Sequence, residues 1–335
     1  MIFIHFLAKM RHLCSKPRRM HQKWTNWLVF ALLSIVWGSS FILMKEGLKA
    51  FTPYQVASLR MLFAGLVLLP FAIKAFRKIP KDKMGIVIVS GLIGNFIPAY
   101  LFCIAETRID SALAGILNSL TPLFTILVGV VFYKTQTTTI KFLGILIGFV
   151  GLTFLLLTGK EMHFENLSYA SLVLIATIMY GVNVHTVGRN LKAIGSIQSA
   201  SVAFSFLILP SAAVLFFTGF FNYNFKDPLV IHSILSSAVL GMVGTSMASI
   251  LFYYLVKQAG ILFGSMVTYG IPIVAVVWGL IYGESLAPLQ VVCLGIILLG
   301  VYIVNRGNLN FIPFLKQKSP PILNWRLYFS KKLDN

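Results

Sequence analysis

Ten apolar runs divide the chain, and short polar stretches separate each run from the next. Each run is about 20 residues long, and a helix of that length crosses the roughly 30 Å hydrocarbon core of a membrane. The pattern therefore predicts ten membrane-spanning helices, at residues 27–46, 54–74, 85–105, 111–133, 139–158, 168–188, 196–218, 231–256, 261–282 and 287–305.

The polar segments suggest how the chain is organised. Residues 1–26 form a basic N-terminal tail, 27–158 and 168–305 hold five predicted spans each, and 306–335 form a second tail rich in basic and aromatic residues. The first span follows a long polar and basic segment and is longer than the apolar core of a signal peptide. We therefore interpret it as a membrane helix that stays in the protein.

Lysine and arginine gather on one side of the predicted spans. With both termini placed in the cytoplasm, 22 of the 28 Lys and Arg residues fall in the tails and inner loops, whereas seven of the nine acids fall outside. This asymmetry follows the positive-inside rule. We expect a multi-pass protein of the cytoplasmic (inner) membrane with both termini in the cytoplasm. The net charge of +19 then reports topology and attraction to anionic membrane lipids, not a nucleic-acid partner.

The composition excludes several other classes of protein. The chain is 58% hydrophobic and 11% charged, against about 45–50% and about 25% in a soluble domain, which rules out a soluble enzyme or a disordered chain. Cys14, Cys103 and Cys293 lack metal-ligand spacing and are interpreted as isolated thiols. The sequence contains no ATP-binding GxxxxGK[ST] loop, no HExxH motif and no carboxylate pair within a span. We therefore expect no enzyme activity, no cofactor and no metal.

The two halves of the chain resemble each other. At a shift of 143 residues Trp37-Gly38-Ser39-Ser40 aligns with Tyr180-Gly181-Val182-Asn183. At a shift of 150, Gly91-x-x-Gly94 aligns with Gly241-x-x-Gly244, Leu101-Phe102 with Leu251-Phe252, and Pro122 with Pro272. Because each copy holds an odd number of spans, the second copy must lie upside down in the membrane. Inverted repeats are typical of secondary transporters, which bind substrate near the midplane where the repeats meet.

These stretches resemble the EamA-type family of the drug/metabolite transporter superfamily. The resemblance covers about residues 27–305 and rests on Trp37–Phe41, Pro53–Arg60, Ser119–Pro122, Tyr269–Pro272, Tyr282–Ser285 and Gly295-x4-Gly300. It implies an all-α fold of ten transmembrane helices in two inverted five-helix repeats, with spans 5 and 10 at the periphery and spans 1, 3, 4, 6, 8 and 9 around a central cavity. One departure is Lys134, which stands where the second copy has Glu284, and this argues against a shared role for the pair.

Equivalent polar positions of both copies are expected to line a site on the pseudo-two-fold axis. Polar side chains within a span are costly unless they face protein or a water-filled cavity. Three polar pairs are equivalent, and an aromatic residue lies one helical turn before each member of the first pair. We predict that these residues bind the solute: Trp37, Ser40, Asn95, Asn118, Tyr180, Asn183, Thr245 and Thr268. The alternative is that the polar ones only hydrogen-bond between helices.

Arg60 and His185 are ionisable side chains inside predicted spans, and each has two interpretations. Arg60 either receives a substrate carboxylate or has a structural role, in which it snorkels outward or clamps helix-end carbonyls and pairs with an outer acid. We favour the structural role. His185 is either packed or solvated, which we favour, or a proton relay. Because no acid lies near the middle of a span, we expect facilitated diffusion or exchange without obligatory proton coupling.

Together these patterns predict a carrier that moves a small organic solute by alternating access. The resemblance implies export of an amino-acid-like or drug-like solute, and the uncharged polar set suits a zwitterion or neutral solute better than a polyanion. The expected partners are this solute and membrane lipids, in a monomer or homodimer. The alternative from another class is a non-transporting receptor or assembly factor that reuses the fold.

Overall fold

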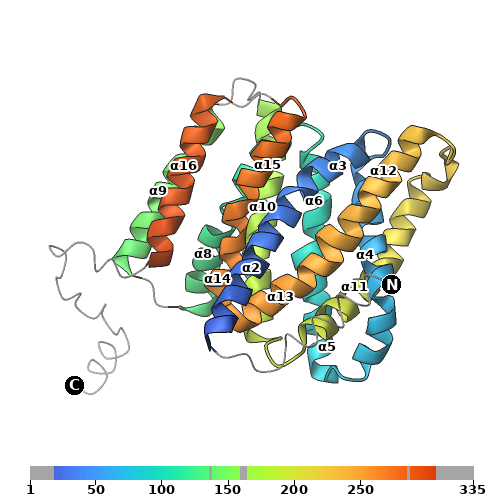
Figure 1. Ribbon diagram of the computed structural model, residues 1–335, viewed down its shortest axis with the longest axis horizontal. Coiled ribbons are helices and arrows are strands. Elements are labelled where there is room, and N and C mark those ends of the chain that lie inside the picture. The colour runs from blue at the N-terminus through green and yellow to red at the C-terminus, as the bar shows by residue number, and fades with distance from the viewer. Residues whose placement is uncertain (1–18, 136–137, 159–163, 285–286, 307–335) are drawn as a thin grey trace, which may run out of the picture.

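The computed structural model describes residues 19–135, 138–158, 164–284 and 287–306, and all regular structure in these ranges is helical (Figure 1). Cys14, the greater part of both tails and Ser285 lie outside the described residues. Ten helical segments follow one another along the chain. Those of the first half are α2 (Arg19–Gly38) with α3 (Ser40–Leu48), α4 (Pro53–Phe76), α5 (Lys81–Gly91) with α6 (Ile97–Ala105), α7 (Ser111–Asn118) with α8 (Thr121–Tyr133), and α9 (Thr139–Thr158).

The second half repeats this order. Its segments are α10 (Phe164–Arg189), α11 (Ser196–Phe217), α12 (Pro228–Val239) with α13 (Ala248–Ala259), α14 (Ile261–Ser265) with α15 (Gly270–Ile281), and α16 (Pro288–Arg306). The ten segments coincide with the ten predicted runs, although helix boundaries differ by several residues. The largest difference is at the start, where α2 already begins at Arg19 within the predicted tail.

The surface of the helical bundle is that of a membrane protein. Within the described residues, eight helical segments are long and apolar enough to cross a membrane, and α9 and α16 contain shorter apolar stretches, Phe142–Phe154 and Pro288–Gly300. Large apolar side chains point outwards, with Leu209 79% and Phe217 84% exposed. A soluble protein rarely exposes large contiguous apolar patches, whereas lipid tails surround such side chains without cost. The chain is an all-α polytopic membrane protein.

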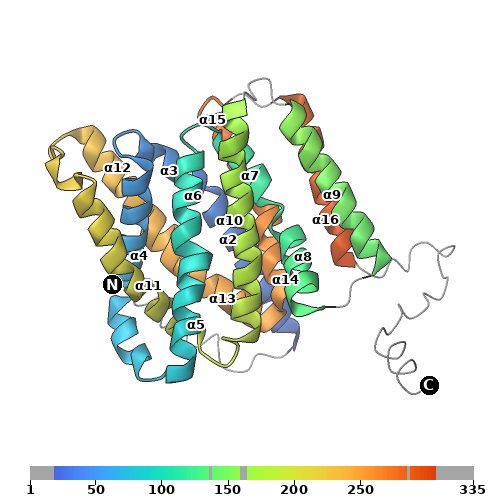
Figure 2. The same cartoon turned by 180° about the vertical axis from the view of Figure 1, so that it is seen from behind.

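The packing between helices is preserved when the two halves are exchanged. In the first half α2 packs on α13 and α15, and in the second half the equivalent α10 packs on α6 and α8. Equivalent helices also cross each other, α4 with α11 and α9 with α16. The α9–α16 pair stands at one side of the bundle in both views, as the resemblance implies for spans 5 and 10 (Figures 1 and 2).

Glycines permit equivalent close approaches in the two halves. A Cβ on Gly91 would lie 3.3 Å from the carbonyl oxygen of Ala203, and a Cβ on Gly241 would lie 2.5 Å from that of Arg60. Gly91 is the repeat equivalent of Gly241, and Arg60 that of Ala203, so one backbone contact occurs twice. The two five-helix halves are therefore related by a pseudo-two-fold axis, the arrangement that an inverted repeat requires.

Several segments are interrupted near their middle. Equivalent π-helical turns, Leu92–Phe96 and Leu240–Met247, join α5 to α6 and α12 to α13. The breaks between α7 and α8 and between α14 and α15 fall just before Pro122 and Pro272. Proline has no backbone N–H to donate and clashes with the preceding turn, which explains these breaks. Such π-helical turns are frequent at functional sites.

The two ends of the bundle carry opposite charge. We call the end with Glu46, Glu106, Asp110, Asp227 and Glu284 the acidic end. The other end, here the basic end, carries the Lys74–Lys83 cluster, Arg189, Lys192 and Lys257.

Candidate functional site

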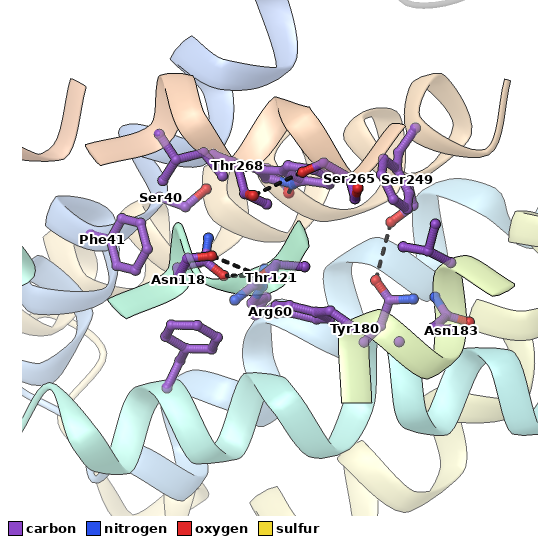
Figure 3. A pocket seen from close by; sticks show the side chains of 18 of the residues that line it. Ser40, Phe41, Arg60, Asn118, Thr121, Tyr180, Asn183, Ser249, Ser265 and Thr268 are labelled. Carbon is purple, nitrogen blue, oxygen red and sulfur yellow. Dashed lines mark hydrogen bonds between the residues drawn. The ribbon is translucent and has the colours of Figure 1, made fainter. Parts of the chain in front are cut away.

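A cavity lies within the bundle where the two halves meet (Figure 3). The space open to the centres of water molecules is about 80 Å³, several times the roughly 10–15 Å³ that one water needs. Among the described helices, ten of the fifteen α-helices and both π-helical turns contribute residues to its wall, whereas α5, α9, α11, α12 and α16 contribute none. The cavity therefore belongs to both repeats.

Seven of the eight residues predicted to bind solute line this cavity, namely Trp37, Ser40, Asn95, Asn118, Tyr180, Asn183 and Thr268. The eighth, Thr245, is 2% exposed and lies behind the wall, where its hydroxyl accepts a hydrogen bond of 2.6 Å from Nε of Arg60. The structure thus brings the predicted set together around one space, with Thr245 one contact away from it.

Two aromatic pairs form matching walls of the cavity. The ring of Trp37 lies 5.2 Å from that of Phe252, and the ring of Tyr180 stacks on that of Phe102 at 6.0 Å. Trp37 is equivalent to Tyr180, and Phe102 to Phe252, so the two pairs are exchanged by the pseudo-two-fold axis. The indole N–H of Trp37 donates to the carbonyl oxygen of Gly244 over 3.0 Å, which fixes its ring. Apolar faces of a solute would meet these rings.

Asparagine side chains on the cavity wall are held by neighbouring hydroxyl groups. Ser90 donates to Oδ1 of Asn183 over 2.6 Å. Ser249, from which a dashed line runs in Figure 3, donates to Oδ1 of Asn95 over 3.1 Å. These bonds fix the orientation of both amide groups. Because both asparagines also line the cavity, they present polar atoms at defined positions there.

Arg60 also lines the cavity, although it is only 9% exposed. Its Nε–H group donates to Thr245, whose own hydroxyl donates to the carbonyl oxygen of Leu240 over 3.0 Å. One terminal nitrogen lies 3.8 Å from the sulfur of Met44. Among the described residues Arg60 forms no ion pair with an acid. Among the described residues it does not hydrogen-bond to a helix-end carbonyl either, so its one hydrogen bond to another helix is the bond to Thr245.

A charged cluster joins the two repeats at the acidic end. Lys45 on α3 forms an ion pair with Glu284, which follows α15, and a second one of 3.3 Å with Asp110. Glu284 also accepts the backbone N–H groups of Ser111 (3.2 Å) and Ala112 (3.1 Å) in the first turn of α7. A carboxylate is stabilised at a helix N-terminus by the unpaired N–H groups and the helix dipole. Glu284 therefore holds the second repeat to the first.

Glu106, at the end of α6, is a buried carboxyl group without a partner. It is 4% exposed, and neither of its oxygens has a hydrogen-bond partner among the described residues. Burial raises the pKa of Glu106 well above its usual range; the nearby Lys45 and Arg60 charges lower it, and Glu284 raises it further. Burial thus disfavours the charged form of this carboxyl group.

At the basic end, side chains tie helices through backbone carbonyls. His185 is 5% exposed, stacks on Tyr133 with ring centroids 4.7 Å apart, and donates from Nε2 to the carbonyl oxygen of Thr125 over 2.8 Å. Lys257 donates to the carbonyl oxygen of Ile194 over 2.7 Å. His185 of α10 is thus packed against α8, which agrees with the interpretation favoured from the sequence.

The described part of the chain contains no group of three or more His, Cys, Asp and Glu residues arranged to hold a metal ion. Cys103 and Cys293 are buried free thiols.

Comparison with known proteins decides the family. The model of the EamA-like transporter family matches residues 25–157 and again residues 167–306, so it occurs twice and spans most of the chain. The chain belongs to the EamA-like transporter family. It is accordingly a membrane transporter and not an enzyme.

Three relatives align with this EamA-like transporter over nearly their whole length. An "uncharacterized transporter" of Archaeoglobus fulgidus is 26% identical, over 84% of this chain and 99% of the relative. The inner membrane transporter YedA of Escherichia coli is 26% identical over 84% and 91% of the two chains, and Protein PagO of Salmonella typhimurium is 23% identical over 82% and 91%. A solved crystal structure at 16% identity superposes with a TM-score of 0.58 over 86% of this chain and 98% of the other, which supports the fold alone.

Sequence reasoning missed part of the cavity wall of this EamA-like transporter. Phe102 and Phe252 align with each other in the repeat, and that alignment was a usable signal for a shared position. Phe41 and Tyr253 also line the cavity, but apolar and aromatic residues are common in every span, and no pattern singles these two out.

Proposed function

We propose that this EamA-like transporter moves a small organic solute across the cytoplasmic membrane by alternating access. The solute occupies the cavity between the repeats, and the direction in the cell is export. The observation that carries the proposal is the cavity itself, which lies on the pseudo-two-fold axis and is lined by equivalent residues of both halves. In inverted-repeat carriers the halves exchange conformations, so that the access path moves from one side of a fixed site to the other.

The eight predicted residues have two roles in this proposal. Trp37 and Tyr180 provide aromatic walls, and the polar members provide hydrogen-bond donors and acceptors at positions fixed by their neighbours. The interruptions at the π-helical turns and before Pro122 and Pro272 give helices that bend beside the solute. Bending at the site links occupancy of the cavity to the movement of the helix ends.

Orientation follows from charge. The basic end holds most of the Lys and Arg residues in the described loops, and cytoplasmic loops are enriched in these residues. We therefore place the basic end and both termini in the cytoplasm, and the acidic end outside. A relative, YedA of Escherichia coli, is named an inner membrane transporter, which agrees with the cytoplasmic membrane as the location.

Transport is proposed to be facilitated diffusion or exchange of solute. Among the described residues that line the cavity, Arg60 is the only charged side chain, and none is an acid or a histidine. Arginine keeps its proton in proteins. None of these side chains can therefore carry a proton across the membrane.

Uptake by proteoliposomes tests the proposal. Purified protein in liposomes is offered a panel of radiolabelled amino acids and small metabolites, with protein-free liposomes as the control. The proposal expects saturable uptake of at least one solute, faster when unlabelled solute is preloaded on the other side. Uptake no faster than in protein-free liposomes for the whole panel would count against a carrier of this solute class.

A further inference from the structure

Arg60 breaks the symmetry of the cavity. The polar residues Ser40 and Asn118 on the wall have the polar equivalents Asn183 and Thr268 in the second repeat. The equivalent of the charged Arg60 is Ala203, which packs against Gly91. No other Lys, Arg, His, Asp or Glu residue lines the cavity among the described residues. Among the described residues, the cavity wall therefore carries a single positive charge, which α4 of the first repeat supplies.

The position of Arg60 is fixed by its backbone and by one side-chain bond. Its carbonyl oxygen lies against Gly241, where a Cβ would come within 2.5 Å of it. Its Nε–H group is held by Thr245, which is in turn bonded to the π-helical turn of the second repeat. These contacts leave little freedom to the guanidinium, and a pre-organised donor binds a ligand at a lower entropic cost.

The terminal nitrogens of Arg60 remain largely unused. A guanidinium has five N–H donors in a planar fork. Thr245 accepts one of them, and the nearest partner of a terminal nitrogen is the sulfur of Met44 at 3.8 Å, a weak acceptor. The guanidinium fork matches a carboxylate bidentately. In Figure 3 the nitrogens of Arg60 lie in the midst of the cavity residues.

The charge of Arg60 lacks a compensating acid. None of the ion pairs among the described residues involves it. A buried charge in a membrane protein is costly unless it is paired. An anionic group on the solute would provide that pairing when the cavity is occupied.

We propose that Arg60 is a specificity-determining residue that binds a carboxylate of the solute in the central cavity. This inference rests on the proposed function and narrows its substrate class to small carboxylates with an apolar or aromatic body. The carboxylate lies on the Arg60 fork, the body lies between the aromatic walls, and any further polar group of the solute meets the asparagines. A single cation suits one carboxylate better than a phosphate dianion.

Matched probes test the inference on purified protein in detergent. The probes are 3-phenylpropionate, its neutral amide 3-phenylpropanamide and the cation 3-phenylpropylamine, which share one aromatic body. Binding is measured as the rise of the thermal unfolding midpoint with probe concentration. For the wild-type protein we expect the acid to bind at least tenfold more tightly than the amide or the amine. Equal affinity for the three probes would overturn the inference.

Three variants assign the preference to Arg60. Arg60→Gln is expected to lose the preference for the acid, and Arg60→Lys to keep a reduced preference, because it retains the charge but not the fork. Arg108→Gln removes an exposed arginine and is expected to bind like wild type. Retention of the full preference in Arg60→Gln would overturn the inference. If Arg60→Gln does not fold, the comparison of the three probes on wild type and on Arg60→Lys still decides.

Failure of the two proposals gives different results. Selective binding of the acid without uptake in proteoliposomes would support carboxylate binding and count against the transport function. Saturable uptake of neutral solutes that Arg60→Gln leaves unchanged would support transport and overturn the role of Arg60.

Discussion

Glu284 offers a quantitative test of how the two repeats are held together. Its side chain is 6% exposed and pairs with Lys45 of the other repeat. It also accepts two backbone N–H groups of α7, with Ser111 and Ala112 as donors. In a state that opens the acidic end, water would replace these partners. Replacing Glu284 by glutamine removes the charge at nearly constant size and should therefore favour opening at this end.

The magnitude follows from the contacts that are lost. A hydrogen bond to a charged group contributes about 1.5–3 kcal/mol, and a charge at a helix N-terminus contributes about 0.3–1 kcal/mol. Lys45 retains Asp110 in the variant, and the glutamine oxygen still accepts from the backbone. We therefore expect a net loss of about 2 kcal/mol, which raises the population open at the acidic end about 30-fold.

A buried reporter next to the cluster measures this population. Met44 precedes Lys45, lines the cavity and is 2% exposed. With the three native cysteines replaced by alanine, Met44→Cys should react with a membrane-impermeant maleimide only when the acidic end opens. Adding Glu284→Gln should raise the labelling rate about 30-fold. Asp227→Asn is the matched control, because this exposed acid caps α12 within one repeat. Unchanged labelling in Glu284→Gln, or an equal rise in Asp227→Asn, would refute the reasoning.

Three further outcomes are expected. A reporter active only in the cytoplasm should work when fused after Asn335 and fail within residues 159–167, and the reverse would overturn the orientation. Because burial raises the pKa of Glu106 well above that of a free glutamate, the folded protein keeps a proton that the unfolded chain releases. Stability should therefore fall as pH rises above the pKa of a free glutamate. Unfolding midpoints measured from about pH 5 to about pH 8 should show this fall in the wild type and in the control Asp110→Asn, but not in Glu106→Gln. If the fall persists in Glu106→Gln, another group causes it. A pH gradient alone should drive no concentrative uptake of solute into proteoliposomes. Concentrative uptake by the wild type that is lost in His185→Ala would show that His185 is a proton relay.

The fold was predictable because it depends on the length and order of apolar runs. The internal repeat also predicted that the second half lies inverted in the membrane, because each half holds an odd number of spans. It also predicted the cavity wall, because the pseudo-two-fold axis brings equivalent positions such as Ser40 and Asn183 around one space. These inferences need only the spacing of residues along the chain.

What escaped sequence reasoning depends on local helix geometry and on packing. The π-helical turn Leu240–Met247 is longer than its equivalent Leu92–Phe96. Asn95 lines the cavity, whereas its equivalent Thr245 does not. Glu106 reads as a loop residue, and its burial arises from the packing of neighbouring helices. The place of Arg60 in the cavity wall depends on the close approach of α4 to Gly241. Periodicity alone carries none of this information.

Transport by cavity variants tests the central claim most directly. In the proteoliposome assay, Trp37→Ala and Asn183→Ala are compared with wild type and with Asn224→Ala, which alters an exposed loop asparagine. We predict that both cavity variants abolish uptake of the transported solute, with unfolding midpoints near that of wild type, and that Asn224→Ala transports normally. Normal uptake by both cavity variants would contradict the assignment of the cavity between the repeats as the solute site.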